Sequence, residues 1–156
     1  MHPHRSLAWW LSTCAGIGHL PIAPGTWGSL AALPAAYVIA LEIGHIWLIP
    51  ISIAVFLVGI WASGAYVRQT GREDPGVIVV DEVAGQLLTL ALAPPGLVAY
   101  AAGFLVFRAL DIFKPFPANW CDRNVKGGLG VMADDMVAGA YGMAILGLGA
   151  WLAGSF

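Results

Sequence analysis

Only 10% of the 156 residues are charged and 59% are hydrophobic, which excludes an ordinary soluble surface, since soluble domains carry roughly 25% charged residues. The length suits a single domain over residues 1–156, and a mean hydropathy of +0.79 predicts an integral or deeply embedded membrane protein. A net charge of −2 with no basic run excludes nucleic acid as a partner.

The N-terminal residues 1–13 contain one arginine followed by a short apolar run. A secretory signal peptide would need a longer apolar core and a cleavage site of small residues. We therefore expect this segment to be retained.

Residues 14–29, CAGIGHLPIAPGTWGS, are dense in glycine and proline and predict a loop. A helix is expected over residues 30–41, with Pro34 tolerated in its first turn and Thr26 or Ser29 as its N-cap. Backbone N–H groups at such a helix start suit an anion. The alternative is a capped turn without a ligand, because the segment is neither a Walker A loop nor a dinucleotide fingerprint.

Residues 50–67 are almost entirely apolar, which is just long enough to span a bilayer. Arg68 and Arg72 follow, and the positive-inside rule places that end in the cytoplasm. Residues 69–76 form the most polar loop of the first half.

Asp81 and Glu82 stand inside the apolar run VIVVDEVAGQLLTLALAPP. On a helix, Glu82 and Gln86 share a face, and Gly85 allows another element to approach closely. Buried carboxylates need a cation or a hydrogen-bonding partner. This pair therefore indicates a metal or catalytic role, with a structural ion pair as the alternative.

Residues 108–135 contain half of the charged side chains of the chain. An apolar helix over residues 97–107 should continue into Arg108 and Asp111 and end before Pro115. A short helix over residues 119–125 should follow. Carboxylates suit a hard cation, and Lys and Arg suit an anion, so the segment indicates a metal-assisted phosphate site.

Asp134 and Asp135 follow a predicted turn, Gly-Gly-Leu-Gly at residues 127–130, and should begin the last helix. Acids in a first turn offset the helix dipole, which is the simpler explanation. One acid would satisfy that role. A second acidic pair that echoes Asp81 and Glu82 instead suggests Mg²⁺ bridging to a phosphate.

Three segments resemble the phosphatidylglycerophosphatase A family: LPIAPGTWGS at residues 20–29, VVDEVAGQ at 79–86, and DIFKPFPANWCDRNVKGGLGVMADDMVAG at 111–139. The resemblance implies an all-α fold, here a compact bundle with about five main helices, several of them apolar and membrane-embedded. It also implies a Mg²⁺-dependent hydrolase that converts phosphatidylglycerophosphate to phosphatidylglycerol and inorganic phosphate. The enzyme would be a multi-pass protein of the bacterial inner membrane, in contact with membrane lipid, with its active site facing the cytoplasm.

The resemblance and the residue pattern give the same expected site. Asp81, Glu82, Asp134 and Asp135 would hold one or two Mg²⁺ ions. The phosphate ligands would be Thr26, Ser29, Lys114 and Arg123. Asp111 and Asp122 would position those cations or supply a metal ligand. Attack by water is favoured over a phosphoryl-enzyme, because the D-x-D-x-T/V start of aspartyl-phosphate phosphatases is absent.

Three other classes of protein compete with the phosphatase as interpretations of the sequence. A small transporter or channel would distribute its acids along helix interiors, whereas these cluster beside loops and helix ends with cations close by. A phospholipid-headgroup transferase would carry D-G-x-x-A-R, which is absent. A membrane assembly factor without catalysis would release no phosphate with or without Mg²⁺.

Overall fold

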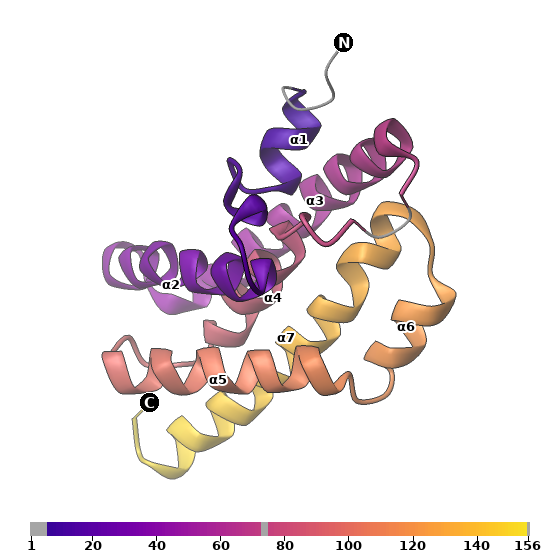
Figure 1. Ribbon diagram of the computed structural model, residues 1–156. Helices are drawn as coiled ribbons and strands as arrows, with labels where there is room; N and C mark the ends of the chain where they lie inside the picture. The colour runs from indigo at the N-terminus through magenta and orange to yellow at the C-terminus, as the bar shows by residue number, and fades with distance from the viewer. Residues whose placement is uncertain (1–5, 73–74, 156) are drawn as a thin grey trace.

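The computed structural model describes residues 6–72 and 75–155, and within these ranges the chain is all-helical (Figure 1). In chain order the elements are α1 (Leu7–Ser12), η2 (Ile17–His19), α2 (Pro24–Glu42), η3 (His45–Trp47), α3 (Leu48–Thr70), α4 (Val80–Leu90), α5 (Leu97–Phe113), α6 (Ala118–Asn124) and α7 (Gly127–Leu152). The prediction of an all-α bundle with about five main helices is confirmed, since α1 and α6 are short and η2 and η3 are single 3₁₀ turns. The first five residues of the segment expected to be retained, and Glu73 and Asp74 of the predicted polar loop, lie outside the described residues.

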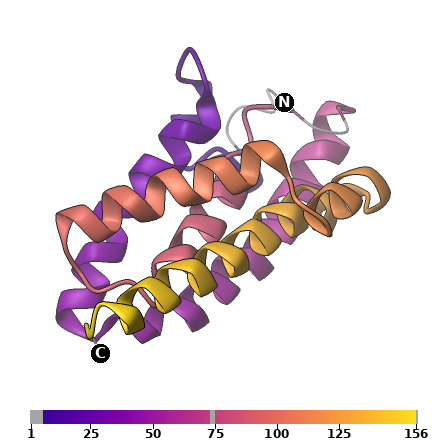
Figure 2. The same ribbon diagram turned by 90° about the horizontal axis from the view of Figure 1, so that it is seen from below.

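Helix α4 occupies the centre of the bundle, where it contacts α2, α3, α5 and α7 (Figure 1). The expected close approach at Gly85 is present, because a Cβ there would lie 2.6 Å from the carbonyl oxygen of Asp135 and 2.5 Å from the ring of Phe107. Gly139 of α7 lies at the same crossing, where an added Cβ would be 2.7 Å from the carbonyl oxygen of Gly85. Two glycines thus let α4 and α7 pack backbone to backbone. Figure 2 shows α5 next to α7 on this side of the molecule.

The predicted start of the helix over residues 30–41 is wrong, because α2 begins at Pro24 and not at residue 30. Pro24 occupies the first turn, where its missing N–H costs nothing. Pro34 consequently lies in the helix interior and not in its first turn. Residues 14–23 form turns and the 3₁₀ turn η2, as the loop prediction expects, whereas Gly28 packs within α2: a Cβ there would lie 2.9 Å from the Cβ of Val79.

The predicted turn at residues 127–130 is also wrong, because α7 begins at Gly127. These glycines fit against neighbouring backbone: a Cβ on Gly128 would lie 2.0 Å from the carbonyl oxygen of Ile60, and one on Gly130 2.1 Å from that of Val125. Asp134 and Asp135 therefore lie about two turns inside the helix. The helix dipole does not explain them.

Two helical segments of the described chain, His45–Thr70 and Gly127–Leu152, are long and apolar enough to cross a membrane by length and composition. Large apolar side chains are also exposed on the outer faces of α2, α3, α5 and α7. Examples are Val38, Leu41, Leu57, Trp61, Leu97, Leu105, Leu148 and Trp151. Such a surface is unfavourable in water and favourable against hydrocarbon.

Candidate active site

A cavity of about 380 Å³ opens where the N-terminal half of α7 meets α6, the start of α4 and the end of α5. Its lining is unusually charged for this apolar chain. The charged lining residues are Asp81, Glu82, Asp111, Lys114, Asp122, Lys126, Asp134 and Asp135. Six of the seven acids in the described part of the chain therefore face one cavity.

Three acids converge at the inner wall of the cavity: Asp81 and Glu82 from α4, and Asp135 from α7. One carboxylate oxygen from each lies within 4.8 Å of the others. Asp81 Oδ1, Glu82 Oε2 and Asp135 Oδ2 are buried and have no hydrogen-bond partner. Hard oxygen ligands left unpaired at this spacing could hold a metal ion.

Burial sets the protonation of this cluster. It raises the pKa of Asp81 well above its usual value, and the charges of Glu82 and Asp135 raise it further. Burial also raises the pKa of Glu82, while the charge of Arg108 partly opposes that rise. A bound cation would remove the cost of keeping these carboxylates ionised together.

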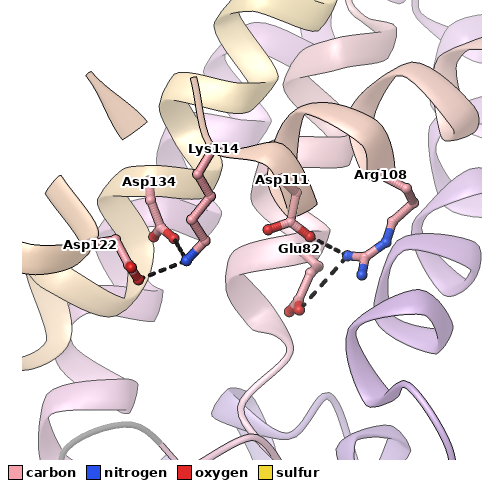
Figure 3. Close-up of polar contacts among 6 residues, drawn as sticks. All are labelled: Glu82, Arg108, Asp111, Lys114, Asp122 and Asp134. Atoms are coloured by element: carbon pink, nitrogen blue, oxygen red, sulfur yellow. Dashed lines mark hydrogen bonds and ion pairs between the residues drawn. The ribbon is translucent and has the colours of Figure 1, made fainter. Parts of the chain in front are cut away.

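Lys114 lines the same cavity and follows directly after the last residue of α5. Its Nζ donates hydrogen bonds to Asp122 Oδ1 at 2.6 Å and to Asp134 Oδ2 at 2.8 Å (Figure 3). Partial burial lowers the pKa of Lys114, but these two hydrogen bonds more than compensate and raise it overall. The side chain is therefore a fixed positive charge at the cavity, held by one acid from α6 and one from α7.

Arg108 forms a second set of charged contacts, with Asp111 and Glu82 (Figure 3). Its guanidinium contacts Asp111 one turn along α5, and its Nη1 lies 4.0 Å from Glu82 Oε1. Asp111 and Glu82 thus share the guanidinium of Arg108. The sequence pattern predicts no individual role for Arg108 or for the cavity residue Lys126, although both belong to the charged segment at residues 108–135.

Three predicted phosphate ligands do not line the cavity. Ser29 is fully buried and its hydroxyl donates to the carbonyl oxygen of Gly25 at 3.0 Å. Thr26 lies in the first turn of α2, with its backbone N–H donating to Ala23 at 2.9 Å. Arg123 is exposed on α6. Lys114 is the one predicted phosphate ligand that the described structure brings to the cavity.

The helix dipole, which the sequence suggested as an explanation for Asp134 and Asp135, acts instead on Asp81 and Glu82. Asp81 and Glu82 lie in the first turn of α4, where the positive end of the helix stabilises negative charge. Asp134 and Asp135 lie inside α7 and receive no such support. Asp134 is compensated by Lys114 instead.

The phosphatidylglycerophosphatase A family model matches residues 10–150 of the chain. The chain belongs to the phosphatidylglycerophosphatase A family. It is 40% identical to the phosphatidylglycerophosphatase A of Escherichia coli strain K12 over 132 residues, covering 84% of this chain and 76% of that protein. With the Haemophilus influenzae phosphatidylglycerophosphatase A it shares 33% identity over 84% of this chain and 81% of the relative.

A Bacteroides thetaiotaomicron relative, whose name proposes a phosphatidylinositol-3-phosphatase, is 35% identical over 92% of this chain and 94% of that protein. No solved structure matches the chain. The family resemblance seen in the sequence, and with it the assignment to an enzyme family of phosphatases, is confirmed. Every charged residue that lines the cavity lies within the part of the chain matched by the phosphatidylglycerophosphatase A model.

Proposed function

We propose that this chain hydrolyses phosphatidylglycerophosphate to phosphatidylglycerol and inorganic phosphate, with Mg²⁺ as its metal. The observation that carries the proposal is the set of Asp81, Glu82 and Asp135, which line a cavity together with Lys114 and each have one buried oxygen without a hydrogen-bond partner. A site with negative ligands for a cation and a fixed positive charge nearby suits a phosphate monoester.

The donor set fits Mg²⁺, since it offers only oxygen ligands and leaves room in the cavity for water and substrate. Asp81, Glu82 and Asp135 would hold the ion. When bound, Mg²⁺ supplies Lewis-acid polarisation of the phosphate and lowers the pKa of water. Asp134, the fourth predicted metal ligand, is paired with Lys114 and is assigned here to positioning that lysine.

Lys114 would bind the phosphate oxygens that face away from the acidic cluster. Asp122 and Asp134 hold its Nζ at the cavity wall, so little side-chain entropy is lost when substrate arrives. The proposal gives no phosphate contact to Thr26, Ser29 or Arg123, which lie away from the cavity. Attack by water on phosphorus is retained as the chemical step.

The distribution of positive charge supports an orientation of the bundle in which the cavity faces the cytoplasm. All six Lys and Arg residues of the described chain lie on or next to segments that border the cavity; they are Arg68, Arg72, Arg108, Lys114, Arg123 and Lys126. By the positive-inside rule this end faces the cytoplasm. The exposed apolar faces of the helices would then lie in the inner membrane as a multi-pass anchor, with the phosphate end of the lipid at the interface.

One observation favours a second substrate, a phosphatidylinositol phosphate. The Bacteroides relative named for that activity covers almost the whole chain. Both lipids present a phosphate monoester on a diacylglycerol-linked headgroup, so the acidic cluster and Lys114 would act on either. The two proposals differ only in the alcohol that leaves.

The test measures phosphate release by the purified protein in detergent, with Mg²⁺ and then with EDTA. Phosphatidylglycerophosphate and phosphatidylinositol 3-phosphate are supplied separately at equal surface concentration. We expect metal-dependent release, faster from phosphatidylglycerophosphate. Faster release from the inositol lipid would replace the first substrate by the second, and no release from either lipid by folded protein would refute a lipid phosphatase.

A further inference from the structure

At Gly25, the first turn of α2 lies directly against Glu82, a proposed metal ligand. A Cβ placed on Gly25 would lie 1.9 Å from Glu82 Oε1, 2.8 Å from Glu82 Cδ and 3.3 Å from Arg108 Nη1. No side chain other than hydrogen fits between this backbone and the carboxylate. The Glu82 carboxylate is therefore confined between the backbone of α2 and the guanidinium of Arg108 on α5.

The position of Gly25 is itself fixed by neighbouring contacts. Ser29, one turn later, donates its hydroxyl to the carbonyl oxygen of Gly25 at 3.0 Å and is fully buried. Gly28 lies on the same face of α2, and a Cβ there would meet Val79, the residue just before α4, at 2.9 Å. The start of α2 is thus held against the start of α4 at two points one turn apart. The backbone at Gly25 is therefore fixed in position next to Glu82.

The other side of Glu82 is equally restricted. Arg108 is largely buried, and its guanidinium is held by Asp111 on the same helix. Glu82 Oε1 faces Arg108, whereas Glu82 Oε2 is the oxygen without a partner in the acidic cluster. The two walls therefore direct one oxygen toward Arg108 and leave the other available to a cation.

We propose that Gly25 and Arg108 are positioning residues that hold the Glu82 carboxylate in the orientation needed for metal binding. The inference rests on the proposed function in that it takes Glu82 as a ligand of Mg²⁺. It assigns the Pro-Gly-Thr segment a steric role in the metal site, in place of the phosphate contact expected from the sequence. Outer contacts that orient a metal ligand are typically worth roughly 10–100-fold in metal affinity.

Substitution of Gly25 by alanine separates this role from a structural one. Gly25 lies in a helix and has no left-handed backbone conformation, so alanine is compatible with its backbone. The atom that the new Cβ would meet first is the flexible end of Glu82, which can move without displacing a helix. We expect G25A to fold and to retain its apparent Tm in EDTA.

The experiment measures Mg²⁺ binding by calorimetry in detergent, without lipid, for the wild type, G25A, E82D and G25A/E82D. G149A is the matched control, since Gly149 is an exposed helical glycine with nothing within 4 Å of an added Cβ. We expect G149A to bind as the wild type does, and G25A to bind roughly 10–100-fold more weakly. Shortening Glu82 by one methylene makes room for the methyl group, so the double variant should bind more tightly than the product of the two single effects predicts.

Three results with the variants would overturn the inference. They are wild-type Mg²⁺ affinity in G25A, multiplicative effects in the double variant, and a marked loss of Tm in G25A without metal, which would mean that backbone and not the carboxylate gives way. Wild-type protein that binds no Mg²⁺ would overturn it as well. Wild-type protein that binds Mg²⁺ but hydrolyses no lipid would instead refute the proposed function and leave the positioning role intact.

Discussion

Replacing Asp135 by asparagine should stabilise the metal-free protein while removing most of its activity. The Asp135 carboxylate lies within 4.8 Å of the carboxylates of Asp81 and Glu82, and its Oδ2 has no hydrogen-bond partner. Asparagine has nearly the same shape but carries no charge. It therefore relieves repulsion in the absence of metal and deletes an ionic ligand in its presence.

The size of both effects follows from the geometry. Two unit charges 4.8 Å apart repel by roughly 3 kcal/mol at an effective dielectric constant of about 20. Because burial and neighbouring acids raise the pKa of Asp81, a bound proton already relieves part of that repulsion, so the net gain should be about 1–2 kcal/mol. For a chain of this size that gain raises Tm by roughly 2–8 °C. Losing a direct ligand should weaken Mg²⁺ binding by more than the roughly 10–100-fold typical of an outer contact.

The assay pairs thermal unfolding in EDTA and in Mg²⁺ with phosphate release from phosphatidylglycerophosphate. D135N should show a higher Tm in EDTA, a smaller increase of Tm on adding Mg²⁺, and at least about a hundredfold slower turnover. Near-normal turnover would remove Asp135 from the metal ligands. A lower Tm in EDTA would refute the argument that the three carboxylates repel one another.

Three further predictions concern the rest of the site. K114M should slow phosphate release by more than about tenfold, because it removes the fixed cation at the cavity. R123M, which neutralises an exposed arginine, should change turnover less than about twofold. Similar losses in both variants would refute Lys114 as the phosphate-binding cation. G85A should lower the free energy of unfolding by about 1–3 kcal/mol, measured by chemical denaturation, because its Cβ would lie 2.6 Å from the Asp135 carbonyl oxygen; wild-type stability would contradict this packing. The pKa of Asp81 is higher in the folded state than in the unfolded chain, so its contribution to stability without metal is fully present at low pH and is lost as pH rises through the folded pKa. Mg²⁺ binds the ionised form, so its increase of Tm should be larger at about pH 8 than at about pH 5, and an equal increase at both would count against raised carboxyl pKa values.

Much of the fold could be predicted from the sequence because composition and helical breaks are local properties. The scarcity of charge predicted an apolar bundle, and Pro115 correctly ended α5 before a short helix. The two errors in helix starts have one cause. At Gly28 and Gly128 glycine serves close packing between helices, and a single sequence does not distinguish that use from a turn.

The sequence by itself determined which side chains are available for chemistry. An apolar chain keeps few acids and cations, so those in the two acidic pairs and the charged segment at residues 108–135 stood out. The tertiary structure alone decided which of them meet. The close crossing at Gly85 brings Asp135 to Asp81 and Glu82, while Asp134, its neighbour in sequence, pairs with Lys114. Adjacent residues on a helix point about 100° apart, so their partners depend on which helices pack around them, and that packing is set by contacts far apart in the chain.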